Sequence, residues 1–353
     1  MESKRRHKDV RDGSLLVVRG NEVQSILSGR EKELLDTVKL AYLAHGRGDS
    51  SLPQSAFLRF PGDEASRIIA LHAYLGGNFN AAGIKCVSSF PTNLDRGFDR
   101  ASAVVTLNSA ETGRPDALLE GSIISAKRTA ASAALAAGVL SYPDDISSVS
   151  VIGCGVINFE IVRFLRVTCP GLRRLCLFDL SRRRAQLFLA HCEEVFPDFH
   201  ISVARNIEEA FGHSRLISFA TTATVPHVSD LSACRAGAVI LHISLRDLVP
   251  EIILSASNVV DDVDHVCRAQ TSIHLAEQSA GNRDFITCTL ADLLREGAAV
   301  RTEKVGITIF SPFGLGVLDI AIATLVRALA IQQGAGTVIE SFLPDSWVPG
   351  NRQ

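Results

Sequence analysis

The chain has 353 residues, of which 46% are hydrophobic and 21% are charged. This composition is typical of a globular protein, and the length exceeds what one hydrophobic core usually accommodates, so two domains are expected. The formal net charge of −2 argues against general nucleic-acid or membrane-surface binding, which requires a strongly basic surface, and favours a small-molecule partner.

The first third of the chain predicts an α+β domain. A short strand is expected over 15–18, and apolar residues at helical spacing predict a helix over 31–45. Four β-like runs separated by turn residues follow, and 108–115 has the composition of a hairpin tip. The four runs are 56–60, 67–74, 81–89 and 103–108.

The middle of the chain predicts a Rossmann-type domain. Residues 122–140 are mostly helix formers, and this helix is expected to stop at Gly138 and Tyr142-Pro143. Strands then alternate with helices, which predicts a parallel sheet covered on both faces. The expected strands are 148–152, 174–179, 200–203, 216–220, 238–243 and 258–261.

A strand over 305–310 and an apolar helix over 317–332 end the pattern. The helix is too apolar to be solvated, so we expect it to pack on the N-terminal domain or on a second subunit. The predicted fold class is therefore α/β, with a Rossmann-type parallel-sheet domain (129–304) inserted into an α+β domain (1–128 with 305–353).

Eight cysteines lie singly in apolar stretches without a CxxC pair, which is typical of reduced core thiols. Residues 1–13 are charged and lack the apolar stretch of a signal peptide, and no later segment is expected to approach the length of a membrane span. These features predict a cytoplasmic protein. The histidines show no HxH or HExxH spacing, and the group from Asp261 to His265 has the composition of a polar loop, so we predict no metal.

Gly153-Cys-Gly155 follows a hydrophobic strand and opens a helix. The first glycine allows the tight turn, and the second lets the backbone approach a pyrophosphate at the helix N-terminus. Asn158 replaces the third glycine of the usual pattern, which we expect to loosen the packing of helix on strand or to shift the helix. An ordinary βα turn is the alternative, but the surrounding β-α alternation favours dinucleotide binding.

Asp179 closes the next strand, where a carboxylate accepts hydrogen bonds from both ribose hydroxyls of NAD and repels a 2′-phosphate. Arg182-Arg-Arg184 follows at once and offers the alternatives of a phosphate contact, as in NADP, or a solvated helix start. The charge of Asp179 favours NAD. Thr221 and Thr222, at the end of a later strand, are suited to the nicotinamide ribose or the diphosphate, although a plain loop is nearly as consistent with their sequence.

Two cationic residues are candidates for binding a carboxylate. Lys85 lies in an apolar strand, where the usual alternative is an edge residue that points into water. Arg128 lies among small residues in the helix over 122–140, and its guanidinium is suited to a carboxylate unless it faces solvent.

Several blocks of the chain resemble the ornithine cyclodeaminase/mu-crystallin family and its alanine dehydrogenase relatives. They are Gly83-Ile-Lys85, 107–115, Leu119-Glu-Gly121 and Arg128-Thr-Ala-Ala131, and the likeness runs from about Leu52 to Leu329. Within the family, the blocks 52–61, 119–125, 153–160 and 243–247 are similar to the N-(2-amino-2-carboxyethyl)-L-glutamate dehydrogenase branch. That branch completes 2,3-diaminopropionate synthesis in siderophore and antibiotic pathways.

The resemblance implies a homodimeric, NAD-dependent amino-acid dehydrogenase whose α+β domain binds substrate and forms the dimer. Lys85 and Arg128 match the substrate-binding lysine and arginine of the family, Arg59 matches a further carboxylate-binding arginine, and Lys85 and Asp247 are the implied catalytic residues. The implied cofactor contacts are Arg128, Thr129, Gly153, Gly155, Val156, Ile157, Asp179, Thr221, Thr222, Ser244 and Asp319.

One departure from the family bears on the reaction. Cyclodeaminases have a Gly-Asp-Cys-Pro-Gly type of motif where this chain has Leu245-Arg-Asp-Leu-Val-Pro250, which argues against ornithine ring closure. The alternatives are an amino-acid cyclodeaminase, a dehydrogenase or imine reductase of a simpler acid, and a mu-crystallin-like binding protein without turnover. Retention of Lys85, Arg128 and Asp247 together argues against the last.

Overall fold

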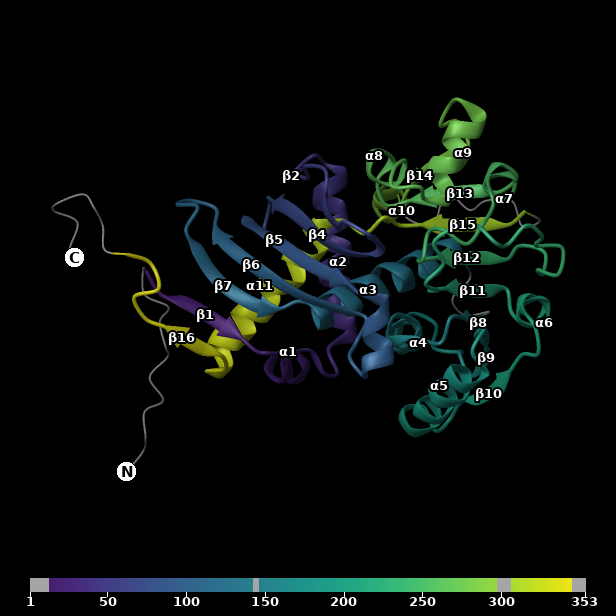
Figure 1. Ribbon diagram of the computed structural model, residues 1–353, viewed down its shortest axis with the longest axis horizontal. Coiled ribbons are helices and arrows are strands. Elements are labelled where there is room, and N and C mark those ends of the chain that lie inside the picture. Colours follow the sequence, from purple (N-terminus) through teal and green to yellow (C-terminus); the bar gives the residue numbers. More distant parts are fainter. Residues whose placement is uncertain (1–12, 142–145, 297–305, 345–353) are drawn as a thin grey trace. The chain divides into compact units, whose positions relative to one another are not determined.

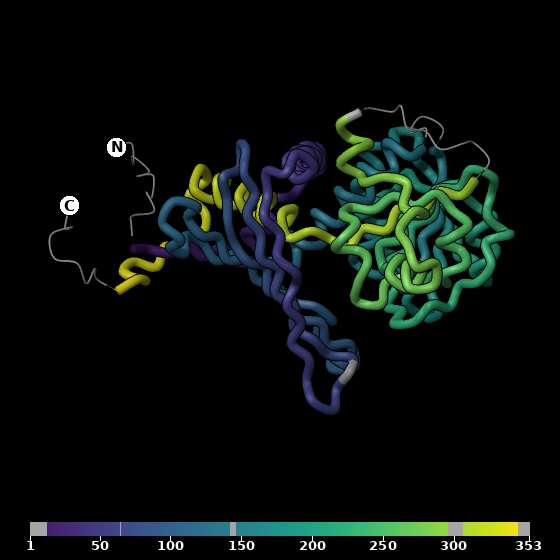
Figure 2. Tube along the Cα trace, turned by 90° about the horizontal axis from the view of Figure 1, so that it is seen from above, coloured from purple at the N-terminus to yellow at the C-terminus, as the bar shows by residue number. Residues whose placement is uncertain are grey.

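The computed structural model of the chain describes residues 13–141, 146–296 and 306–344, which form two compact units (Figures 1 and 2). The first unit takes in Arg47–Ser125, the described residues up to Arg30 and those from Gly316 onward. The second takes in Glu31–Gly46 and the described residues within Ala126–Leu315. Most of the charged segment 1–13, the predicted stop at Tyr142-Pro143 and the predicted boundary at 304/305 lie outside the described residues.

The first unit is built on a mixed sheet in the order β16-β1-β7-β6-β5-β4-β2, with β3 paired to β4. Its strands are β1 (Leu15–Val18), β2 (Ser50–Ser51), β3 (Ala56–Phe60), β4 (Asp63–Leu75), β5 (Ala81–Ser89), β6 (Ala101–Ser109), β7 (Pro115–Glu120) and β16 (Thr337–Ile339). The helical segments are α1 (Gly20–Leu27), a 3-10 turn η1 (Pro91–Arg96) and α11 (Gly316–Gln333).

Helix α11 packs on β4, β5 and β6, as its apolar composition predicts. The approach is close at Gly83, because a Cβ added there would lie 2.8 Å from Cδ1 of Ile320. The odd-numbered residues of β5, including Gly83 and Lys85, therefore share the sheet face that α11 covers, since strand side chains alternate between faces.

The second unit contains a sheet in which every strand pair is parallel, in the order β10-β9-β8-β11-β12-β15-β13-β14. The strands are β8 (Ser148–Ile152), β9 (Arg174–Phe178), β10 (His200–Val203), β11 (Leu216–Phe219), β12 (Val239–His242), β13 (Ser257–Val260), β14 (Ile286–Thr289) and β15 (Thr308–Ser311). The helices are α2 (Glu31–Gly46), α3 (Ser122–Leu140, which begins in the first unit), α4 (Val156–Thr168), α5 (Arg182–Val195), α6 (Ile207–His213), α7 (Pro250–Leu254), α8 (Val263–Val266), α9 (Ser272–Ala280) and α10 (Leu290–Glu296).

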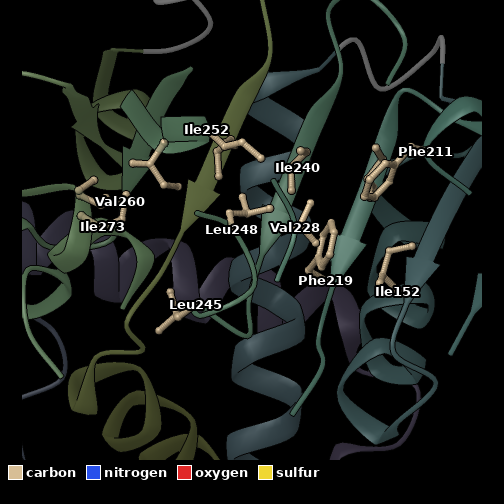
Figure 3. Close-up of a cluster of buried hydrophobic side chains, with 14 of the residues drawn as sticks. Ile152, Phe211, Phe219, Val228, Ile240, Leu245, Leu248, Ile252, Val260 and Ile273 are labelled. Carbon is tan, nitrogen blue, oxygen red and sulfur yellow. The ribbon is translucent and has the colours of Figure 1, made fainter. Parts of the chain in front are cut away.

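The central strands of this sheet are more buried than its edge. Strands β11, β12 and β15 are buried at every residue, as expected of parallel strands covered on both faces, whereas the edge strand β10 alternates between exposed and half-buried residues. Figure 3 shows part of the resulting hydrophobic core, in which Phe219, Ile240 and Leu248 pack together with side chains from neighbouring loops and helices. The predicted α/β fold class is confirmed.

Several expectations differ from the observed elements. Gly138 does not stop α3, which continues to Leu140, because glycine only weakens a helix and no atom within 4 Å would meet its Cβ. Strand β15 begins at Thr308 and lies between β12 and β13 of the second unit. Helix α2 packs on α4 and α10 and so belongs to the second unit, unlike in the predicted division.

Two helices, α3 and α11, are long and apolar enough to cross a membrane, so the expectation that no segment approaches this length was wrong. More than half of the most apolar window of each helix is buried inside the protein, as in the core helices of globular domains. All eight cysteines lie among the described residues, and each is a free thiol.

Candidate functional site

The turn between β8 and α4 is shaped by two glycines with different roles. Gly153 has a φ of +90°, and a Cβ there would lie 2.6 Å from the carbonyl oxygen of Ala220, so the turn itself requires glycine. A Cβ on Gly155 would meet only Nη2 of Arg184, at 3.6 Å. The packing of the chain therefore does not require the second glycine, and the backbone at this position has room for the approach of a ligand.

The N-terminus of α4 is open to a ligand. Gly155 is its N-cap, no side chain caps it, and Val156 in the first turn is 66% exposed. The first N–H groups of a helix lack intrahelical acceptors and carry a partial positive charge, which suits a phosphate. Ile157 lies in the same turn and is half-buried. The residues present thus fit the pyrophosphate of a dinucleotide.

Asn158 fixes this turn, in contrast to the expected loosening or shift. Its side chain is fully buried, and Nδ2 donates to the carbonyl oxygens of Ile152 and Gly153 at 2.9 and 2.7 Å. Its Oδ1 accepts a hydrogen bond from Ser218 on β11 at 2.7 Å. Hydrogen bonds thus replace the close contact that a third glycine would allow.

Asp179, directly after β9, holds the same turn from the other side. Its Oδ2 accepts the N–H of Cys154 at 2.8 Å, and its Oδ1 accepts the N–H of Ser181 at 2.8 Å. Nε of Arg184 lies 3.8 Å from Oδ2, whereas Arg182 and Arg183 are exposed at the start of α5. Of the three arginines, Arg184 is therefore the one placed beside both Asp179 and Gly155.

Asp247 is the centre of a buried polar cluster at the ends of β11 and β12. Its carboxylate accepts hydrogen bonds from the hydroxyls of Thr221 and Ser244, and Oδ2 lies 3.2 Å from Nε2 of His242. The Nδ1 of His242 is 3.2 Å from Oγ of Ser311 on β15. Burial opposes ionisation, but the hydrogen bonds and charge of His242, together with both hydroxyls, hold the pKa of Asp247 below its usual range.

The accessible groups of this cluster are its hydroxyls. The side chain of Asp247 has no exposed surface, whereas Thr221 and Ser244 are half-buried and Thr222 is exposed. Sequence reasoning missed His242, although a histidine at the end of the otherwise apolar β12 is a detectable signal, because a buried imidazole needs polar partners.

The turn that carries Ser244 and Asp247 is strained. Leu245 has a φ of +69°, a conformation that is unfavourable for a residue with a Cβ. Its side chain is buried in the core cluster (Figure 3), and its carbonyl oxygen accepts the N–H of Ser272 at 2.7 Å. Burial of the Leu245 side chain therefore offsets the unfavourable positive φ of its backbone.

Arg128 is buried in α3 beside Gly314, and Thr129 follows it half-buried. Gly314 has a φ of +93°, and a Cβ there would lie 2.8 Å from Nη1 of Arg128. Asp261 holds this segment, because its carboxylate accepts the N–H groups of Phe313 and Gly314 at 2.8 and 2.7 Å. Asp261 is 1% exposed, and burial raises its pKa, so it is not part of the solvated polar loop expected from sequence.

In the first unit, Lys85 is buried rather than at an edge, because β5 lies between β4 and β6. Its Nζ is 2.7 Å from Oδ2 of Asp319 on α11 and donates to Oγ of Ser125 at 3.1 Å. Asp319, predicted to contact the cofactor, is thus paired with the predicted substrate-binding lysine. Arg59, on β3, is exposed and lies over the ring of Phe57 in the same unit.

Comparison with known proteins identifies the class. The chain belongs to the ornithine cyclodeaminase/mu-crystallin family, whose model matches residues 22–334. It is 26% identical to N-((2S)-2-amino-2-carboxyethyl)-L-glutamate dehydrogenase from Staphylococcus aureus, over 93% of this chain and 99% of the relative.

Solved structures agree with this assignment. Thermococcus litoralis Δ1-pyrroline-2-carboxylate reductase, in complex with NADH and L-proline, is 25% identical, with a TM-score of 0.83 over 91% of this chain and 99% of the other. An archaeal alanine dehydrogenase dimer with bound NAD is 27% identical, with a TM-score of 0.81 over 93% and 99% of the two chains. The predicted enzyme class, an NAD-dependent oxidoreductase acting on amino acids or imines, is confirmed at the level of the family.

Proposed function

We propose that the chain catalyses the NAD-dependent oxidative hydrolysis of N-(2-amino-2-carboxyethyl)-L-glutamate. The substrate, NAD⁺ and water are converted to 2-oxoglutarate, L-2,3-diaminopropionate, NADH and a proton. The observation that carries the choice of substrate is the number of cationic side chains at matched positions, Lys85, Arg59 and Arg128, because a substrate with three carboxylates needs several such partners. The Staphylococcus aureus relative supports the same choice.

The dinucleotide turn supports NAD as cofactor. The free N–H groups at the start of α4 and the open backbone at Gly155 are suited to the pyrophosphate, and Asp179 to the adenine ribose. When bound, NAD supplies a two-electron acceptor for the hydrogen on the α-carbon of the glutamate half of the substrate. Val156, Ile157, Arg128, Thr129, Thr222 and Asp319 are the further cofactor contacts that we propose.

Lys85, Arg128 and Arg59 are proposed to bind the carboxylates. A guanidinium offers two parallel N–H groups to a carboxylate, and Arg128 is held in one orientation by its packing against Gly314. Lys85 carries a proton that the substrate amine or carboxylate can share, and its pairing with Asp319 fixes the position of the ammonium.

Asp247 is proposed to accept the proton released when water adds to the imine carbon. Because its oxygens are enclosed, the proton would pass through the hydroxyl of Ser244 or Thr221, which gives its own proton to Asp247 as it takes one from water. Collapse of the resulting carbinolamine breaks the C–N bond and releases the amine and the ketone. The half-buried hydroxyls are thus the groups that touch the reacting atoms.

The proposed enzyme is a cytoplasmic homodimer, and its products serve 2,3-diaminopropionate-dependent siderophore or antibiotic synthesis. The eight free thiols support a reducing compartment. Exposed apolar residues on the sheet face opposite α11, Tyr74, Ile84 and Val104, support the association of two chains through the first unit.

The test is to incubate the purified protein with NAD⁺ and N-(2-amino-2-carboxyethyl)-L-glutamate in ¹⁸O-labelled water. We expect NADH and 2-oxoglutarate in equal amounts, with the new ketone oxygen drawn from water. Ornithine, alanine and proline serve as comparison substrates. Proline and ammonia from ornithine without net NADH would instead establish a cyclodeaminase, and NAD binding without turnover of any of these would establish a binding protein.

A further inference from the structure

Two arginines face each other on the sheet of the first unit. Residues Arg59 of β3 and Arg67 of β4 are direct partners in the antiparallel register, so their side chains leave the same face of the sheet. Like charges directly opposite each other destabilise a strand pair. This arrangement therefore needs a reason other than the folding of the hairpin.

Neither arginine forms an ion pair among the side chains that the structure describes, although Asp63 begins β4 opposite Phe60 in the same hairpin. No described carboxylate pairs with Arg59 or Arg67, and the recorded contact of Arg59 is with the ring of Phe57, 6.0 Å from its guanidinium carbon. Arg67 is half-buried, and burial together with the charge of Arg59 lowers its pKa. A desolvated cation beside a second cation attracts an anion.

The register also relates the arginine pair to Lys85. Arg67 is opposite Ser89 and Leu71 is opposite Lys85, with no shift of register between these positions. Arg59, Arg67 and Lys85 therefore share one face of the sheet, and the two ends of this row are four residues apart along β5, which is about 13 Å. Between them lie Ile69 and Val87, both half-buried.

We infer that Arg59 and Arg67 form a distal anion subsite that binds a substrate carboxylate remote from the one held at Lys85. This inference rests on the proposed function and deepens it, because it predicts a long substrate with several carboxylates rather than a short amino acid such as alanine or proline. Arg67 is then the residue that determines substrate length, and the apolar strip at Ile69 and Val87 contacts the carbon chain between the charged groups.

The kinetic test compares wild type with Arg67→Gln, Arg59→Gln and Arg67→Lys. Arg67→Gln should raise the KM for N-(2-amino-2-carboxyethyl)-L-glutamate about tenfold or more, with kcat within about threefold and the Kd of NAD unchanged. Arg67→Lys should retain part of the affinity because it keeps the charge. Arg205→Gln removes an arginine that is 87% exposed in the second unit and should change none of these values.

Truncated substrates identify the carboxylate concerned. N-(2-aminoethyl)-L-glutamate lacks the carboxylate of the diaminopropionate half, and N-(2-amino-2-carboxyethyl)-L-alanine lacks the side-chain carboxylate of the glutamate half. One of the two should lose affinity in wild type and show no further loss in Arg67→Gln. If Arg67→Gln weakens every substrate equally, or none, the subsite is refuted.

A binding measurement separates this inference from the proposed reaction. If wild type forms no NADH from any N-substituted glutamate, the reaction fails, and calorimetric titration with tricarballylate then decides on the subsite. Tighter binding to wild type than to Arg67→Gln supports it, and equal or absent binding refutes it. Folding is controlled by thermal denaturation, in which Arg67→Gln should match or exceed the wild-type Tm, because removing one of two facing like charges relieves repulsion.

Discussion

Polar side chains in the second unit hold the loops to which a ligand would bind. Asn158, Asp179 and Asp261 each bond to two or more backbone groups of a neighbouring turn. A buried polar side chain stabilises the fold when all its hydrogen bonds are formed. Removal of one partner leaves the other partner buried without a hydrogen bond, which destabilises the fold. Substitution of these residues is therefore expected to change ligand binding through the shape of the backbone.

The preference for NAD over NADP is expected to depend on Asp179. The wild type should bind NAD more tightly than NADP, because the carboxylate would face a 2′-phosphate. Arg184→Ala should weaken NADP further while leaving NAD nearly unchanged, since Arg184 lies beside both Asp179 and Gly155. The Kd of each dinucleotide can be measured by fluorescence titration, with Arg183→Ala as an exposed control. Equal or tighter binding of NADP by wild type would assign the arginines to a phosphate.

Asp247→Asn is expected to lower kcat by roughly 10²–10⁴-fold, with little change in the Kd of NAD, because the amide cannot take up the proton from Ser244 or Thr221. Ser244→Ala and Thr221→Ala should each have a smaller effect if the two hydroxyls share the proton transfer. The kcat of each variant is measured by steady-state kinetics with N-(2-amino-2-carboxyethyl)-L-glutamate. Normal turnover by Asp247→Asn would rule out the proposed proton acceptor.

Asp247 is also expected to make the stability of the fold depend on pH. The pKa of Asp247 is lower in the folded protein than its ordinary value, so the unfolded chain binds the proton more readily. Its contribution to stability is therefore complete above the unfolded pKa, about 4, and is lost as pH falls through the lower, folded value. The difference in Tm between wild type and Asp247→Asn should be constant near neutral pH and shrink below about pH 4.

The residues of the dinucleotide turn could be predicted because the pattern is local: the glycines follow the end of one strand, and the aspartate follows the end of the next. The contacts of Lys85 with Asp319, and of His242 with Asp247 and Ser311, could not be derived from spacing. Each joins elements that are remote along the chain or involves a turn of unusual conformation. The left-handed Leu245 gives no sequence signal, since leucine rarely adopts that conformation.

Among the elements, the segment between β15 and α11 depends on one glycine. Gly314→Ala should raise the substrate KM, because the new Cβ would displace the guanidinium of Arg128, and it should destabilise the fold by about 1–2 kcal/mol through its positive φ. Gly281→Ala is the matched control, with a φ of +72° and no atom within 4 Å of the added Cβ. If both variants change KM and Tm alike, the contact with Arg128 has no specific role.

The length and burial of an element decided how well its sequence predicted it. Long periodic segments such as α2, α3 and α11 were found within two residues of their expected ends, and buried β11 and β12 within one or two. The short α1 and β14 were not predicted, because a few residues carry too little periodicity. The position of β15 between β12 and β13 could not be predicted from the residues of β15, because it depends on how the strands of the whole sheet are ordered.

At the scale of the whole molecule, we expect the protein to sediment as a dimer. Val104 and Ile84, 45% and 37% exposed, share the sheet face opposite α11, so Val104→Glu should shift the protein towards monomer by placing a charge in an apolar interface. Leu187→Glu, on α5 in the second unit, is a control because Leu187 is 62% exposed. Analytical ultracentrifugation distinguishes the outcomes, and a monomeric wild type would contradict the assembly.

The late position of β15 and α11 in the chain has a consequence for biosynthesis. Strands β12 and β13 each pair with β15, which begins only at Thr308, and the sheet of the first unit is covered by α11, which begins at Gly316. A ribosome that has made the first three hundred residues has therefore completed neither unit, although domains usually fold one after another during translation. The nascent chain presents unpaired strand edges and an uncovered apolar sheet until β15 and α11 have emerged from the ribosome, and protection from aggregation matters most before that point.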